Sequence, residues 1–121
     1  VDRGIGVDVE NVSRFTKFEQ NKTHAFLQKV FTERELKYCF SQARPAEHLA
    51  GRFAAKEAVI KAFSGTLDNV IAYNEIEIGR SKEGSPAVKI ARVKLGSRGV
   101  QISISHTSEI AIAFVVVTDY E

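Results

Sequence analysis

Residues 46–63, AEHLAGRFAAKEAVIKAF, decide the fold of this 121-residue chain. Six alanines give the segment a high helix propensity. Large apolar side chains recur along one side of it at helical spacing, namely Leu49, Phe53, Ile60 and Phe63. Pro45 stands just before the segment and Ser64-Gly65 just after it, as is usual at the two ends of a helix. We therefore expect one long helix whose apolar stripe packs on the rest of the domain.

The residues before this helix predict one strand and several short helices. Residues 4–9, GIGVDV, alternate three β-branched side chains with Gly4, Gly6 and Asp8, the period of a half-buried strand. Asp8 then lies on the face opposite to the apolar one. Residues 11–31 indicate two short helices with a break near residues 21–23. Thr32 and Glu35 form a capping-box pattern that begins another helix.

The residues after the long helix predict an antiparallel sheet. Strands are expected at residues 74–78, 87–93, 100–105 and 110–117, with turns at residues 84–86 and 106–109 that make two hairpins. Helices gather in the first half and strands in the second. We therefore expect an α+β fold in a single domain, 1–121, in which the long helix packs on an antiparallel sheet beside shorter N-terminal helices.

Composition excludes several classes of protein. A net charge of +2 is too small to favour a nucleic-acid partner. The longest apolar run, residues 110–117, is far shorter than the roughly 20 residues of a membrane span, and no charged-then-apolar leader precedes the first strand. We expect a soluble, cytoplasmic protein with no membrane partner. The single cysteine, Cys39, cannot form an internal disulfide, and its apolar neighbours indicate a core residue.

Glu57 is the first candidate for a functional side chain. At about 100° per residue it lies about 40° from Phe53 and about 60° from Ile60, so its carboxylate emerges beside the apolar stripe. A carboxylate in such a position needs a partner. Lys61, four residues on, predicts an i,i+4 ion pair as one alternative. The other is a metal site, because Asp8 and Glu57 together would suit Mg²⁺.

Three further side chains carry charge where a ligand could meet them. His106 ends an expected strand at a turn, where it suits either a phosphate contact or a bond to nearby backbone. Arg52 and Lys56 project from the side of the long helix opposite Lys61. They are expected to serve the outer part of an extended ligand, to serve a neighbouring subunit, or to be solvated.

Three segments in this order carry a family resemblance. They are GIGVDVENVSRF near the start, LAGRFAAKEAVIKAF in the middle and VQISISHTSEIAIAFVVV near the end. With its first-strand aspartate, its Lys-Glu-Ala-x-x-Lys helix and its Ser-x-Ser-His-Thr strand end, the chain resembles the holo-acyl-carrier-protein synthase type of phosphopantetheinyl transferase. The Gly84-Ser85-Pro86 turn fits the same pattern.

The resemblance implies a set of residue roles. Asp8 and Glu57 would hold Mg²⁺, while Lys61 and His106 would meet the phosphates of coenzyme A. Arg52 would bind the nucleotide end of coenzyme A, and Arg14 of the first helix would dock an acidic acyl carrier protein. Glu57 and Lys61 would then be the catalytic pair.

The resemblance also implies the reaction and the assembly. A carrier serine would attack the β-phosphate of coenzyme A and release adenosine 3′,5′-bisphosphate, with Glu57 or a metal-bound water as the base. As in small members of this family, the chain would assemble as a homotrimer with the coenzyme A site between subunits. Two alternative hypotheses remain. The first is a non-catalytic module that binds a carrier protein or a nucleotide, and the second is a nucleic-acid-binding domain.

Overall fold

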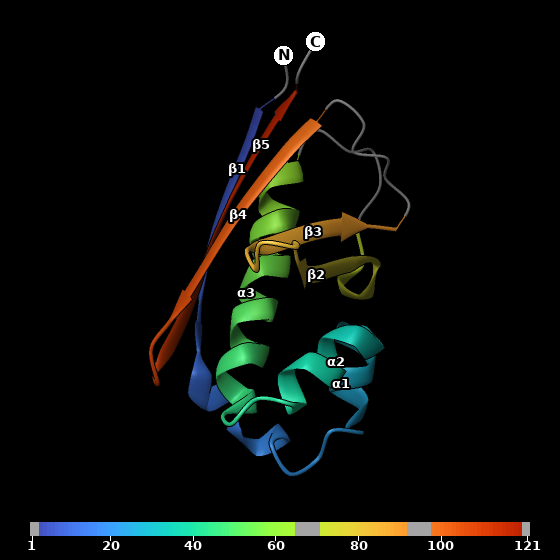
Figure 1. Ribbon diagram of the computed structural model, residues 1–121, viewed down its shortest axis with the longest axis vertical. Helices are drawn as coiled ribbons and strands as arrows, with labels where there is room; N and C mark the ends of the chain where they lie inside the picture. The colour runs from blue at the N-terminus through green and yellow to red at the C-terminus, as the bar shows by residue number, and fades with distance from the viewer. Residues whose placement is uncertain (1–2, 65–70, 92–97, 120–121) are drawn as a thin grey trace.

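The computed structural model describes residues 3–64, 71–91 and 98–119 of the chain. One strand, then the helices and then four more strands follow one another along the chain, which Figure 1 shows from blue at the N-terminus to red at the C-terminus. They are β1 (Arg3–Asn11), the 3-10 turns η1 (Val12–Arg14) and η2 (Thr16–Phe18), α1 (Ala25–Val30), α2 (Glu33–Phe40), α3 (Pro45–Phe63), η3 (Tyr73–Glu75), β2 (Ile76–Arg80), β3 (Pro86–Ile90), β4 (Arg98–His106) and β5 (Ile110–Asp119).

These elements confirm the expected α+β fold and differ from it in detail. Residues 74–75, expected to begin a strand, belong to η3, and the strand is β2 at residues 76–80. The strands form two antiparallel sheets, a three-stranded one in the order β1-β5-β4 and the β2-β3 hairpin. The first of the two expected short helices is replaced by the 3-10 turns η1 and η2. Thr32 and Glu35 do form the expected capping box at the start of α2. Gly65 and residues 92–93, expected at element ends, lie outside the described residues.

Helix α3 runs through the middle of the molecule, between the three-stranded sheet on one side and α2 with the β2-β3 hairpin on the other (Figure 1). Residues on nearly its whole circumference are therefore buried, and the expected single apolar stripe was too narrow. Alanines fill the positions where the sheet comes close, including Ala54, Ala58 and Ala62. No helix within the described ranges is long and apolar enough to cross a membrane.

Strand β1 packs on α3 through its glycines. A Cβ atom on Gly4 would lie 1.8 Å from the carbonyl oxygen of Ala62, and one on Gly6 would lie 1.9 Å from that of Ala58. Because no side chain fits in this gap, the glycine-bearing face of β1 is the one that meets the helix. The half-buried strand was expected to bury its apolar side chains, and this expectation is wrong.

Those apolar side chains instead point away from α3. Ile5, Val7 and Val9 are 64%, 46% and 55% exposed. On β5, Phe114 pairs with Val7 and Ile112 pairs with Val9, so the same outward face continues across both strands. The outer apolar face is formed by Ile5, Val7, Val9, Ile110, Ile112 and Phe114, each at least 40% exposed. An exposed apolar surface of this kind is typical of an interaction site.

A buried ion pair joins α2 to α3. Lys56, expected to be solvated or to face a ligand, is fully buried, and its Nζ lies 2.7 Å from Oε1 of Glu35. Burial lowers the pKa of Lys56, and the Glu35 carboxylate opposes that shift. Glu35 also accepts hydrogen bonds from the backbone N–H groups of Thr32 and Ile78. The pair therefore ties both helices to the start of the β2-β3 hairpin.

Candidate active site

Asp8 lies on the face of β1 that meets α3, and Lys61 contacts it there. The Nζ of Lys61 donates to Asp8 Oδ1 at 3.2 Å and to the carbonyl oxygen of Val7 at 3.0 Å. The other carboxylate oxygen, Asp8 Oδ2, is buried and has no hydrogen-bond partner among the described residues. A buried carboxylate oxygen without a partner is costly. The site is therefore suited to receive a cation or a hydrogen-bond donor from a ligand.

Glu57 accepts a hydrogen bond from the hydroxyl group of Tyr73, which the sequence analysis did not identify. This hydrogen bond, together with burial, raises the pKa of Tyr73 to about 12. The expected ion pair between Glu57 and Lys61 is not formed, since the ion pair of Lys61 in the described part of the chain is with Asp8. The i,i+4 interpretation of this helix motif is therefore wrong.

The packing of β1 on α3 brings Asp8 and Glu57 to the same place. Gly4 faces Ala62 and Gly6 faces Ala58, so two residues of the strand advance beside four residues of the helix. By the same step, Asp8 lies beside the next turn toward the helix N-terminus, at the level of Ala54 and within one helical turn of Glu57. Tyr73, whose pKa is raised mainly by its hydrogen bond to Glu57, also lies close enough to Asp8 for the Asp8 charge to raise that pKa, and Lys61 contacts Asp8 directly. We call Asp8, Glu57 and Lys61 the carboxylate group.

Arg14 lies at the border of the carboxylate group. Its guanidinium Nη1 is 3.0 Å from Glu10 Oε1, and its Cζ lies 4.9 Å from the centre of the Phe53 ring. Half of its side chain remains exposed. Burial raises the pKa of Glu10 to about 7, and so does the neighbouring Asp8 carboxylate, which accepts a hydrogen bond from the Glu10 carboxyl group only when Glu10 is protonated. The sequence analysis missed Glu10, although strand alternation puts it on the same face as Asp8.

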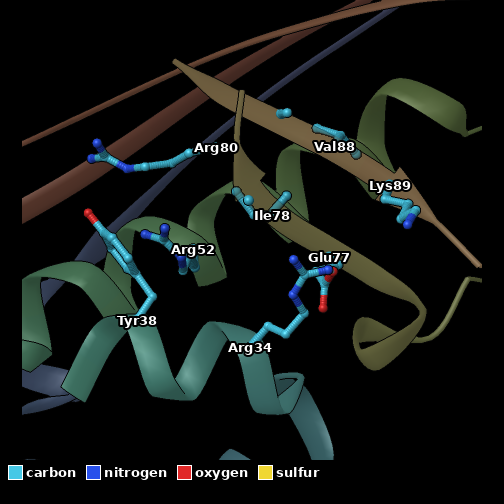
Figure 2. Close-up of a pocket in the computed structure, with 10 residues that line it drawn as sticks. Arg34, Tyr38, Arg52, Glu77, Ile78, Arg80, Val88 and Lys89 are labelled. Carbon is cyan, nitrogen blue, oxygen red and sulfur yellow. The ribbon is translucent and has the colours of Figure 1, made fainter. Parts of the chain in front are cut away.

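A second group of expected site residues surrounds Arg52 on the other side of α3. Arg52 and His106 both line a cavity of about 180 Å³. The Cζ of Arg52 lies 4.1 Å from the centre of the Tyr38 ring, and the Cζ of Arg80, on β2, lies 5.2 Å from the same ring centre (Figure 2). Arg52 is 7% exposed, and its Nε has no hydrogen-bond partner among the described residues. The stacked arginines therefore make this cavity suited to an anion.

His106 lies at the end of β4, where two side chains of α3 contact it. Its Nδ1 is 3.6 Å from Glu47 Oε1, and its ring centre is 5.4 Å from that of His48. Burial, and then the charges of His106 and Arg52, lower the pKa of His48. We call Arg52, Arg80, His48 and His106 the basic group. Arg80 and His48 were not identified from the sequence.

The carboxylate group and the basic group lie on opposite sides of one molecule. Arg52 and Lys61 are nine residues apart in α3, which at about 100° per residue puts them half a turn apart. Asp8 lies on β1, at one edge of the three-stranded sheet, whereas His106 lies on β4, at the other edge. A single chain therefore does not unite the expected site residues in one cleft.

Comparisons with known proteins identify the family. A sequence profile described as the 4'-phosphopantetheinyl transferase superfamily matches residues 4–115. The chain belongs to this superfamily. It is 45% identical to a holo-[acyl-carrier-protein] synthase of Thermodesulfovibrio yellowstonii, over 95% of this chain and 97% of the relative. The expected class of enzyme, a transferase of the holo-acyl-carrier-protein synthase type, is thereby confirmed.

Solved structures of the superfamily share the fold. The holo-[acyl-carrier-protein] synthase of Neisseria meningitidis is 31% identical, with a TM-score of 0.80, and the match covers 96% of this chain and 98% of that one. The Bacillus anthracis enzyme, solved in complex with CoA (3',5'-ADP), is also 31% identical, with a TM-score of 0.78 and coverage of 97% and 96%. The fold that holds the two groups is therefore the fold of a transferase known to bind coenzyme A.

The described residues alone do not complete a metal site. No cluster of three or more histidine, cysteine, aspartate or glutamate side chains suited to a metal ion is formed among them. Two carboxylates are nevertheless an ordinary number of protein ligands for Mg²⁺, which keeps several waters and takes other ligands from substrate phosphates. The unpartnered Asp8 Oδ2 fits such an ion.

Proposed function

We propose that this chain transfers the 4'-phosphopantetheine group of coenzyme A to a serine of an acyl carrier protein, in a magnesium-dependent reaction. The proposal rests on the buried Asp8 Oδ2, which lacks a partner beside Glu57 and Lys61. Asp8 and Glu57 would hold the ion, and Lys61 would contact the phosphates. Family membership and the coenzyme A complex of the Bacillus anthracis relative support this assignment.

The proposed reaction needs charge stabilisation and positioning and no protein nucleophile. The serine Oγ forms a bond to the β-phosphorus of coenzyme A, and the bond from that phosphorus to the bridging oxygen of the pyrophosphate breaks. Adenosine 3′,5′-bisphosphate leaves with that oxygen, and the serine proton passes to Glu57 or to a bound water. Bound Mg²⁺ would supply positive charge to the pyrophosphate. Lys61, whose Nζ lies beside Asp8, would stabilise the negative charge of the leaving phosphate.

The basic group is proposed to bind the nucleotide end of coenzyme A. Its cavity combines the unpartnered Nε of Arg52 with the guanidinium of Arg80, a match for a phosphate. His106 at the opening is proposed to make a further phosphate contact. The ionisable groups that face it include Glu47 and His48.

The separation of the two groups supports a site shared between chains. Because the carboxylate group lies near the β1 edge and the basic group near the β4 edge, a ring of chains would bring the two together from neighbours. The outer apolar face lies on β1 and β5, next to the β1 edge, and its burial would drive the assembly. We propose a homotrimer, as the family resemblance implies.

Mass spectrometry of a carrier protein tests this function. Incubation of apo acyl carrier protein with the enzyme, coenzyme A and Mg²⁺ should add the mass of one phosphopantetheine group to one serine. Asp8→Ala and Glu57→Ala should each remove most of the transfer. Glu33→Ala, which changes an exposed carboxylate of α2, is the matched control and should keep it. Equal magnesium-dependent turnover in all four proteins would refute the assignment.

A further inference from the structure

Tyr73 holds a position that the expected mechanism does not use. Three residues of α3, spaced so that they share one face of the helix, contact it. The Phe53 ring packs against the Tyr73 ring with centres 5.3 Å apart, Lys56 Nζ donates to the Tyr73 carbonyl oxygen at 2.8 Å, and Glu57 Oε1 accepts from the Tyr73 hydroxyl. The ring, the backbone and the hydroxyl group of one residue are thus all held by the same helix.

The turn that carries Tyr73 is itself anchored. Lys56 donates to the carbonyl oxygen of Ile76 as well as to that of Tyr73, so it binds the first residue of η3 and the first residue of β2 that follows it. The ion pair with Glu35 fixes Lys56 in turn. The Glu75 carboxylate accepts a hydrogen bond from the backbone N–H of Ala72 at 2.9 Å, which joins the last residue of η3 to the residue that precedes this turn. Because these hydrogen bonds fix the backbone of the turn, the Tyr73 hydroxyl group is held in place beside Glu57.

We propose that Tyr73 is a positioning residue that holds Oε1 of Glu57 so that Oε2 is oriented as a ligand for the metal ion. This inference rests on the proposed function, in which Glu57 is one of two carboxylate ligands. A glutamate has three side-chain torsions, and a hydrogen bond to one oxygen restricts them before the ion arrives. Outer partners of this kind orient metal ligands, and their loss typically costs tenfold to a hundredfold in metal affinity.

Tyr73→Phe is the matched variant, because it keeps the ring that packs on Phe53 and removes the hydroxyl group. The probe is Mn²⁺ in the presence of coenzyme A, with free Mn²⁺ followed by electron paramagnetic resonance. We expect the dissociation constant for Mn²⁺ to rise about tenfold or more. Coenzyme A binding without metal and the melting temperature should stay nearly unchanged, which separates positioning from a general structural role.

A second variant shows whether Tyr73 acts through Glu57. In the Glu57→Gln background, removal of the Tyr73 hydroxyl should have little further effect on kcat at saturating coenzyme A, because the carboxylate that it orients is gone. Equal Mn²⁺ affinity in the natural chain and in Tyr73→Phe would overturn the inference and leave the proposed function standing. The inference would also be overturned if Tyr73→Phe lowered kcat in the Glu57→Gln background by the same factor as in the natural chain. Absence of Mn²⁺ binding by the natural chain would overturn the magnesium assignment and this inference with it.

Discussion

Replacement of Lys56 by methionine tests the buried ion pair that links the core to the proposed site. Lys56 is fully buried, and its Nζ donates to Glu35 and to the carbonyl oxygens of Tyr73 and Ile76. Methionine fills a similar volume, so Lys56→Met creates little cavity. It leaves the Glu35 carboxylate buried with two backbone N–H donors and no cation.

The expected cost follows from that unpaired charge. Breaking a buried ion pair by removal of one partner destabilises a protein by about 3–5 kcal/mol. For a chain of this length, an unfolding entropy of about 2.1 cal/mol/K per residue converts this loss to a melting temperature lowered by about 12–20 °C. Because the pair is buried, added salt should change the loss very little.

Urea denaturation and thermal melting of three variants measure the effect. The double variant Lys56→Met with Glu35→Gln removes the stranded charge, so it should be more stable than Lys56→Met alone. Glu35→Gln alone is the matched control for the loss of the acidic partner. A free energy of unfolding within about 1 kcal/mol of the natural chain for Lys56→Met would refute the buried pair as a stabilising element.

Four other changes test separate parts of the molecule. Lys61→Ala should lower kcat by more than about tenfold with nearly unchanged melting, since its side chain is half exposed; a lower melting temperature with normal turnover would contradict a phosphate role. Arg14→Glu should raise KM for the carrier protein and leave coenzyme A binding unchanged, with a defect that salt reduces; loss of coenzyme A affinity alone would assign Arg14 to the nucleotide cavity. Phe114→Lys should reduce the mass measured by light scattering to that of one chain and abolish transfer, whereas an unchanged mass would argue against assembly through the outer apolar face. Burial raises the pKa of Cys39 to about 12, so stability should fall as pH rises from about 9 toward 12, because the unfolded thiol ionises first. Cys39→Ala should weaken that dependence, whereas an unchanged pH dependence would contradict the buried thiol; Tyr73, whose pKa is also raised, keeps part of it in both proteins.

Much of the fold could be predicted from local patterns. The capping box at Thr32, the alanine-rich helix and the two hairpin turns are signals that depend on neighbours in sequence, and each forms within a few residues of its expected place. The first hairpin turn lies at residues 81–85 rather than at 84–86. The burial of Lys56 could not be predicted in this way. Its partner Glu35 lies 21 residues earlier in another helix, and a lone lysine in a helix gives no sign of such a partner.

The residues of the candidate site could be predicted from the sequence, but their positions relative to one another could not. Family resemblance names Asp8, Glu57, Lys61, Arg52 and His106, but a motif in one chain carries no information on which residues share a cleft. The helical angle between Arg52 and Lys61 was the one local signal that they face apart. Tyr73 gave no signal at all, because its hydroxyl reaches Glu57 only after the chain has returned past α3.

The exposure of Ile5, Val7 and Val9 shows why alternation alone does not fix the buried face of a strand. A period of two separates two faces, and hydrophobicity normally decides which one is inside. Here Gly4 and Gly6 decide it, because any Cβ atom at either position would overlap a carbonyl oxygen of α3. The apolar face is then turned outward, where in a single chain its side chains remain in contact with water. The sequence of β1 is explained if both of its faces are buried, the glycine face by α3 of its own chain and the apolar face by a second chain. The same arrangement would bring the basic group of a neighbouring chain to the carboxylate group.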